Sequence, residues 1–299
     1  MIARWRDGLT ISTKQAIWAW GFLALPVLFF VVVRFAPSLY AFTLAFTNWN
    51  ILGTPRFVGW ENFTRLWNDP VFWQAFANTF RYLILGVPVS LVVSFVIAYY
   101  LDQVRFLHGF IRALYFVPFL TTAAAMAWVW KWLYQPLPIG FFNKLLALVG
   151  IAQQPFLNST VQALPAVLAV AIWAGMGFNV VIFLAGLRAI PETYYEAARI
   201  DGVSRTRILW EITLPLLRPT IIFLVVISSI GFLRIFDQVF NMTTDGDGGP
   251  LNSTTPLVLY IYRTAFKTFQ MGYATALTVV LFLVMLMVTL LQLWVARKR

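Results

Sequence analysis

The sequence offers few side chains that could carry out catalysis. Among 299 residues there is no cysteine and only one histidine, which excludes disulfides, thiolate metal sites and multi-histidine metal clusters. No nucleophile stands at a useful spacing from a general base. The phosphate-binding pattern G-x-x-x-x-G-K-[ST] is also absent, because the Gly-rich stretch Gly246–Gly249 is not followed by Lys-Ser or Lys-Thr. We therefore expect a chain that is not an enzyme and holds no cofactor of its own.

One polar segment, residues 188–219, could instead recognise a partner. Glu192 suits the positive N-terminal end of a helix, and Gly202 supplies a tight turn further along. A second helical stretch, Ser204–Thr213, follows, and Pro215 redirects the chain. These residues predict a short helix–turn–helix with mixed charge on its exposed side. From composition alone, this segment could equally well be a partner-binding site or a solvated surface helix that only joins two membrane spans.

A second set of polar residues stands within apolar stretches, where a polar group is costly and usually faces a cavity or a protein partner. Asn179 could hydrogen-bond a solute hydroxyl or, equally well, a neighbouring helix. Gly175 allows close helix packing or an irregular backbone beside a cavity. Arg234 and Asp237 are three residues apart and can meet on one helix face. Such a pair either lines a hydrophilic cavity or, as we favour, neutralises itself.

The elements that must position these residues are membrane-spanning helices. Hydrophobic residues make up 61% of the chain and charged residues 11%, less than half the charge of a soluble protein, and the mean hydropathy is +0.78. The segments between the apolar runs are too short for a separate domain. We expect an all-α polytopic bundle, one transmembrane domain over residues 1–299. Its six runs of bilayer-spanning length are Ala16–Thr47, Thr79–Leu101, Phe110–Tyr134, Val161–Leu187, Pro219–Phe240 and Tyr273–Ala296.

Positive charges indicate how the six spans are oriented. Six spans place both termini on one side, and that side carries most of the basic residues. Cytoplasmic loops show such an excess, so we expect cytoplasmic termini and a cytoplasmic segment 188–219. The net charge of +11 follows the membrane boundaries, and no nucleic-acid partner is expected. The basic residues on the side of the termini are Arg4, Arg6, Lys14, Arg105, Arg112, Arg188, Arg199, Arg205, Arg207, Arg218, Arg297, Lys298 and Arg299.

Segment 188–219 resembles the EAA loop of ABC importer permeases. The resemblance rests on Glu196-Ala197-Ala198, then Gly202, then Ile212-x-Leu214-Pro215. Further stretches are similar to the sugar branch of these permeases, and together they resemble the larger permease subunit of maltose and glycerol-phosphate importers. These stretches are Phe57–Phe63, Asp69-Pro70-x-Phe72-Trp73, Asn78-Thr79, Gly248-Gly249-Pro250 and Tyr260–Gln292.

The resemblance implies a type I ABC importer permease fold and roles for individual residues. Segment 188–219 would form the cytoplasmic coupling helix, which docks on a separate ATPase subunit that binds ATP and Mg. Its contact residues would be Glu196, Ala197, Ala198, Asp201 and Gly202. By resemblance to the maltose permease, the substrate path would include Phe119, Ala174, Gly175, Phe178, Ser228 and Phe232, to which we add Asn179 and Asp237.

The resemblance thus predicts a permease subunit that imports a carbohydrate, polyol or glycoside by alternating access. Its partners would be a second permease subunit, two ATP-binding subunits, an extracytoplasmic solute-binding protein and a small carbohydrate-like solute. Its place would be the lipid bilayer of a bacterial or archaeal cytoplasmic membrane. The alternative is an ion-coupled secondary transporter, for which Asp237 is the one carboxylate well inside a predicted span. A membrane enzyme ranks last.

Overall fold

A computed structural model describes residues 11–103 and 108–297. Within these ranges the regular structure is helical, apart from an isolated bridge between Thr47 and Phe57. Five of the basic residues used to orient the spans lie outside the described residues: Arg4, Arg6, Arg105, Lys298 and Arg299. The chain forms two compact units. Unit 1 comprises Met1–Leu66 with Thr264–Val279, and unit 2 comprises Trp67–Arg263 with Val280–Arg299.

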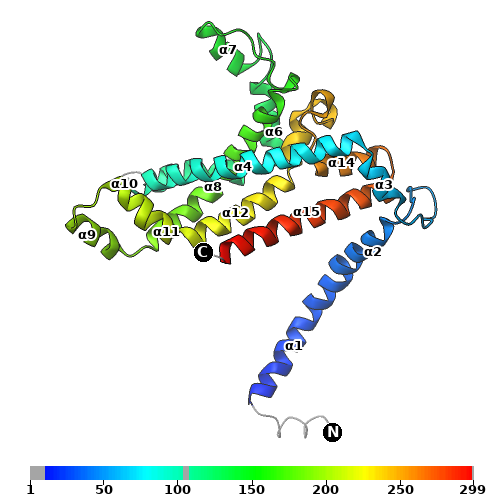
Figure 1. Cartoon of the computed structure of the whole chain (residues 1–299), viewed down its shortest axis with the longest axis horizontal. Helices are drawn as coiled ribbons and strands as arrows, with labels where there is room; N and C mark the ends of the chain where they lie inside the picture. Colours follow the sequence, from blue (N-terminus) through cyan, green and yellow to red (C-terminus); the bar gives the residue numbers. More distant parts are fainter. Residues whose placement is uncertain (1–10, 104–107, 298–299) are drawn as a thin grey trace. The chain divides into compact units, whose positions relative to one another are not determined.

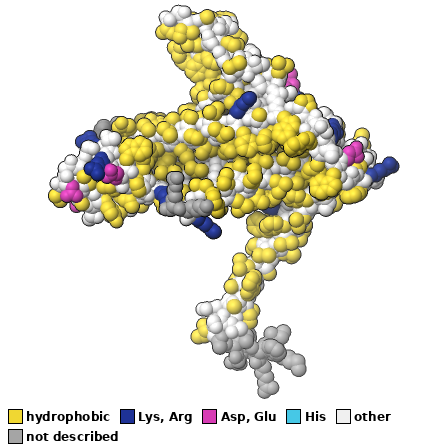
Figure 2. All heavy atoms as spheres, in the orientation of Figure 1, with side chains coloured by type: hydrophobic (Ala, Val, Ile, Leu, Met, Phe, Trp, Pro, Cys, Tyr) yellow, Lys and Arg dark blue, Asp and Glu magenta, His cyan; other side chains and the backbone are white. Residues whose placement is uncertain are grey.

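Unit 1 begins with a long apolar helix. Helix α1 (Ile11–Phe29), the π-helical stretch η2 (Phe30–Phe35) and α2 (Ala36–Leu44) follow one another without a break over 34 residues. No residue of α1 is buried, and Figure 2 shows many exposed hydrophobic side chains along this helix. So much exposed apolar surface suits lipid and would not be stable in water.

A buried amide organises the rest of unit 1. Asn62 lies in α3 (Glu61–Trp67), and its Nδ2 donates to the carbonyl oxygens of Ala45 and Thr47, both at 2.8 Å. These two bonds tie the short helix to the chain that leaves α2. The amide of Gly272, at the start of α15 (Met271–Arg297), donates to Trp49 O at 2.9 Å.

Unit 2 is built on three packed helices, α4 (Pro70–Gln103), α8 (Ala163–Arg188) and α12 (Arg218–Leu233), with α5 (His108–Leu120) against α8 (Figure 1). Small residues let the helices approach closely. A Cβ added at Gly177 would lie 2.2 Å from the carbonyl oxygen of Tyr115 on α5. A Cβ added at Gly86 would lie 2.6 Å from the ring of Phe232 on α12.

Shorter elements complete unit 2. In chain order they are α6 (Ala123–Leu133), α7 (Phe141–Leu148), η3 (Phe156–Asn158), α9 (Glu192–Ile200), α10 (Arg205–Ile208), η4 (Leu209–Thr213), α11 (Leu214–Leu216), α13 (Asp237–Met242), η5 (Thr244–Gly246), η6 (Pro250–Asn252) and α14 (Leu257–Tyr262), followed by η7 (Arg263–Lys267), which continues into unit 1.

The prediction of six spans is confirmed in number when each bent helix pair is taken as one span. Four helices of the described chain are long and apolar enough to cross a membrane: Ile11–Leu44, Pro70–Gln103, Ala163–Arg188 and Met271–Arg297. Two bent pairs, Gly109–Leu120 with Ala123–Leu133 and Arg205–Leu216 with Arg218–Leu233, supply the others. The second span begins nine residues earlier than the predicted Thr79.

The prediction that Phe110–Tyr134 crosses the membrane as one continuous helix is wrong. The chain turns by 97° between α5 and α6. Thr122 is extended at ψ 135°, so the helical bonding stops between Leu120 and Ala123. The third span is therefore two helices that share a corner.

The prediction that the fifth span continues to Phe240 is also wrong. Helix α12 ends at Leu233, and α13 starts afresh at Asp237. Arg234 and Asp237 are both exposed and belong to different elements, and no ion pair joins them in the described part of the chain. Ending the apolar helix before Arg234 keeps both charges out of its span, where they would be costly.

Candidate functional site

The first candidate site is the segment formed by α9, α10 and η4, which we call the coupling segment. Helix α9 ends in a Schellman motif: the amide of Val203 donates to Ala198 O at 2.9 Å, and that of Gly202 to Arg199 O at 3.2 Å. Gly202 has φ +69°, a left-handed conformation that glycine adopts without steric cost. The turn expected after Asp201 is confirmed, and its cause is this backbone geometry.

The second half of the coupling segment folds back beside α9. Ser204 caps α10 by accepting a hydrogen bond from the amide of Arg207, and Arg207 Nε lies 2.9 Å from Glu211 Oε1. The hydroxyls of Tyr195 and Thr213 lie 3.3 Å apart and join the two halves. A bend of 66° then leads into α12. Between the halves lies a hollow of about 440 Å³.

The predicted contact residues are divided between the surface and the interior of the coupling segment. Glu196, Ala197, Asp201 and Gly202 are exposed, whereas Ala198 is buried. Ala198 therefore serves the packing of the segment. Figure 2 shows charged side chains gathered over α9 and α10.

Sequence reasoning missed two exposed apolar side chains on the coupling segment. Ile200 is 85% exposed and Trp210 is 66% exposed. Large hydrophobic groups on a polar, charged segment suit a protein interface. The available signal was the presence of these two large apolar residues in a polar segment, Ile200 directly before the Asp201-Gly202 turn and Trp210 between Arg207 and Glu211 in sequence.

The second candidate site is a cavity of about 350 Å³ inside unit 2, which we call the helix-lined cavity. It lies among α4, α5, α6, α8 and α12, and the residues after α12 close one side. Predicted path residues that line it together include Phe119, Gly175, Phe178, Asn179, Ser228 and Phe232. Ala174 lines it as well. Asp237 does not line this cavity, because the helix that was expected to carry it inward has already ended.

The helix-lined cavity combines an aromatic wall with neutral polar groups. The rings of Phe119 and Phe178 stack with centroids 5.5 Å apart. Asn179 Nδ2 donates to Ser90 Oγ at 3.0 Å, so the interhelical bond considered from the sequence is present, and the residue borders the cavity as well. No Asp, Glu, Lys, Arg or His of the described chain lines the cavity. The arrangement can hold a neutral molecule with apolar faces and hydroxyl edges.

Three further polar residues of the helix-lined cavity were not predicted: Ser90, Thr121 and Gln238. Ser90 and Ser94 are four apart on α4, which was a signal for one helix face within an apolar run. Thr121 and Gln238 lie at the corners that interrupt the third and fifth spans, and the sequence analysis predicted no corner in either span.

Comparison with known proteins identifies the family of this helical chain. Residues 16–299 match the family described as "Binding-protein-dependent transport system inner membrane component". The chain belongs to this family. It is therefore a multi-pass membrane protein and a transport permease, and the predicted membership of the ABC importer permeases is confirmed.

Two similar relatives are named as sugar transport permeases. It is 35% identical to the lactose transport system permease protein LacF of Rhizobium radiobacter, over 82% of each chain. It is 33% identical to the arabinooligosaccharides transport system permease protein AraP of Bacillus subtilis, over 97% of this chain and 90% of that one.

Among solved structures, the permease is similar to a chain of a bacterial ABC transporter involved in the import of the acidic polysaccharide alginate. The TM-score is 0.85 at 22% identity, with 96% of this chain and 97% of the other covered. This likeness shows a shared fold, so the predicted type I permease fold is confirmed.

Proposed function

We propose that this permease imports a neutral carbohydrate, or a related polyol or glycoside, through the helix-lined cavity. The observation that carries the proposal is the lining of that cavity, where a stacked aromatic pair accompanies neutral hydrogen-bonding groups and the described residues contribute no charged side chain. Sugars present apolar ring faces and hydroxyl edges, which match such a surface. LacF and AraP are named for lactose and arabinooligosaccharides, which supports the same class.

An acidic sugar or a glycerol phosphate suits the helix-lined cavity poorly. An anion that leaves water needs a cation or several converging donors to offset its desolvation. The cavity offers the hydroxyls of Ser90, Thr121 and Ser228 and the amides of Asn179 and Gln238, without a cationic partner. These groups satisfy alcohols at a much lower cost than they would satisfy a carboxylate or phosphate.

We further propose that the coupling segment faces the cytoplasm, with both termini, and docks on a separate ATPase subunit. Exposed Glu196 and Asp201 would contact that subunit, and exposed Ile200 and Trp210 would bury apolar area against it. The functional assembly would contain a second permease, two ATP-binding subunits that hold ATP and Mg, and an extracytoplasmic solute-binding protein. In this assembly the permease would act as one translocation domain and would catalyse no reaction itself.

The solute class is tested in proteoliposomes that contain the whole transporter. ATP-dependent uptake is measured for neutral oligosaccharides and for uronic-acid and phosphorylated sugars of similar size. We expect uptake of neutral sugars only, and its loss in Gly175→Leu, because no atom lies within 4 Å of a Cβ added at Gly175 and the new side chain would fill the cavity. Gly21→Leu is the matched control, since Gly21 has equally open surroundings and lines no described cavity. Preferential uptake of anionic sugars would contradict the proposal.

The docking of the coupling segment is tested by co-purification. Glu196→Lys reverses an exposed charge and should weaken recovery of the ATPase with the permease. Lys144→Glu reverses an exposed charge on α7 and should leave recovery unchanged. Equal recovery with both variants and full transport by both would refute this role of the segment.

A further inference from the structure

A second cavity of unit 2 has a different character from the helix-lined one. It measures about 480 Å³ and lies between the end of α6, the residues around η3 and the Gly-rich segment that follows α13. We call it the loop cavity. Its lining includes several polar side chains: Lys131, Tyr134, Gln135, Asn158, Thr244 and Asp247.

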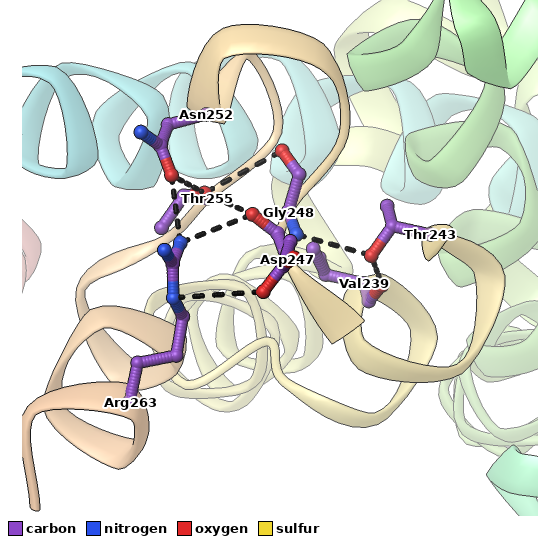
Figure 3. Close-up of polar contacts among 7 residues, drawn as sticks. All are labelled: Val239, Thr243, Asp247, Gly248, Asn252, Thr255 and Arg263. Carbon is purple, nitrogen blue, oxygen red and sulfur yellow. Dashed lines mark hydrogen bonds and ion pairs between the residues drawn. The ribbon is translucent and has the colours of Figure 1, made fainter. Parts of the chain in front are cut away.

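A dense hydrogen-bond network fixes the Gly-rich wall of the loop cavity (Figure 3). Arg263 Nη1 donates to Asp247 O at 3.1 Å and to Asn252 Oδ1 at 2.7 Å. On the other side, the Thr243 hydroxyl accepts a hydrogen bond from the amide of Gly248 at 3.1 Å and donates to Val239 O at 2.8 Å. The wall is therefore held from both of its ends.

Glycine is required at the centre of this wall. Gly248 has φ +75°, and a Cβ added there would lie 1.9 Å from the hydroxyl oxygen of Thr255. Gly249 continues the same backbone at φ +73°. So constrained a loop keeps its polar groups in one geometry, as a preformed binding site requires.

The chemistry of the loop cavity suits a molecule with many hydroxyl groups. The Lys131 ammonium donates to Thr243 O at 3.1 Å, and an ammonium carries three N–H donors in all. Thr244 and Asn158 are exposed residues of the lining, and each side chain can both donate and accept hydrogen bonds. Tyr134 supplies an aromatic ring. One cation and one carboxylate, Lys131 and Asp247, leave the lining without net charge.

The two cavities lie along the same pair of packed helices, α6 and α13. At the start of α6, Ala123 and Met126 border the helix-lined cavity, and Lys131 near its end borders the loop cavity. From Met126 to Lys131 the helix rises by about 7.5 Å at roughly 1.5 Å per residue. An oligosaccharide of a few units can bridge that separation.

We propose that the loop cavity is a second carbohydrate subsite, which binds one unit of a neutral oligosaccharide whose other end reaches the helix-lined cavity. The proposal rests on the function proposed above and deepens it, because it assigns the solute to oligosaccharides. Short sugars occupy one cavity, and longer ones gain contacts from both.

The experiment compares the chain-length dependence of uptake. The complete transporter in proteoliposomes, with excess solute-binding protein, receives neutral gluco-, galacto- and arabino-oligosaccharides from disaccharides to pentasaccharides. Thr244→Trp fills the exposed rim of the loop cavity, and Thr244→Val removes one hydroxyl at nearly constant volume. Thr160→Trp and Thr160→Val are the matched controls, since Thr160 is an exposed threonine that lines no described cavity.

We expect Thr244→Trp to raise the KM for the longest imported sugar about tenfold, a loss of about 1.4 kcal/mol of binding, and to leave the shortest one unchanged. Thr244→Val should shift the KM in the same direction by a smaller factor, and neither control should change it. A loss that is equal at all lengths would mean that this surface docks the binding protein, and would overturn the proposal. So would an unchanged length dependence in both Thr244 variants.

The failure of the proposed function gives a different result. If the wild-type transporter imports no neutral sugar, or Gly175→Leu imports every length as well as the wild type, the helix-lined cavity is not the path and both proposals fall. If Gly175→Leu abolishes uptake while Thr244→Trp leaves the length dependence intact, only the second subsite is refuted.

Discussion

Replacing Gly202 by alanine should strain the turn after α9 and so partly uncouple ATP hydrolysis from transport. A Cβ added at Gly202 meets no atom within 4 Å, so the substitution causes no clash. The strain comes from the left-handed backbone at φ +69°, which costs an L-residue about 1–2 kcal/mol. A local equilibrium shifted by that amount changes about 5–30-fold. We expect the Schellman turn to be lost in much of the population and the coupling segment to fit its partner less often.

The chain offers a close control for this substitution. Gly150 ends α7 with the same Schellman bonds, from Gly150 N to Ala147 O at 3.1 Å and from Ile151 N to Leu146 O at 2.9 Å. It has φ +76° and equally open surroundings. Gly150→Ala should therefore carry the same backbone strain at a site far along the chain from the coupling segment.

The assay measures solute imported per ATP hydrolysed in proteoliposomes, together with thermal stability of the purified transporter. Both variants should lose a similar, small amount of stability. Only Gly202→Ala should lower the coupling ratio, by several-fold, and Gly202→Asn should lower it less because asparagine tolerates the left-handed region. A coupling ratio that falls equally in Gly150→Ala, or that stays at the wild-type value in Gly202→Ala, would refute the reasoning.

Three other substitutions test the fold and the remaining alternative. Gly177→Val should sharply reduce the yield of folded protein on size-exclusion chromatography, because its Cβ would overlap the carbonyl oxygen of Tyr115, whereas Gly175→Ala should not. Asn62→Leu should lower the free energy of unfolding by about 1–3 kcal/mol, since it removes the donor from one buried and one part-buried hydrogen bond to carbonyl oxygens. Asp237→Asn should leave ATP-driven uptake unchanged, and the wild-type transporter should show no uptake when an ion gradient is imposed without ATP. Gradient-driven uptake that is lost in Asp237→Asn would favour a secondary transporter.

The sequence predicted the features that depend on local chemistry. Long apolar runs mark the spans because their composition alone selects the bilayer, and Gly202 marks the turn because few other residues adopt its backbone conformation. The spans were nevertheless misjudged at Thr121–Thr122 and at Arg234. At both places the flanking residues are apolar enough to continue a helix, and no single-sequence periodicity reveals that the chain turns there.

The candidate cavity was predictable only in part for the same reason. Phe119, Phe178 and Phe232 came from the resemblance to a known sugar permease, and the structure brings them to one cavity. Gln238 could not be assigned to the cavity from the sequence. Its position depends on the end of α12 at Leu233 and on the separate helix α13 that begins at Asp237. The same missed helix end explains why Gln238 lines the cavity and the neighbouring Asp237 does not.

The absence of charged side chains around the helix-lined cavity has an electrical consequence. A membrane potential of 100 mV does work of about 2.3 kcal/mol on each elementary charge that crosses the bilayer. A neutral solute in a cavity whose described lining holds no Asp, Glu, Lys, Arg or His carries no such charge across. Import should then proceed equally well in polarised and depolarised vesicles, and the steepness of the solute gradient would be set by the ATP supply alone.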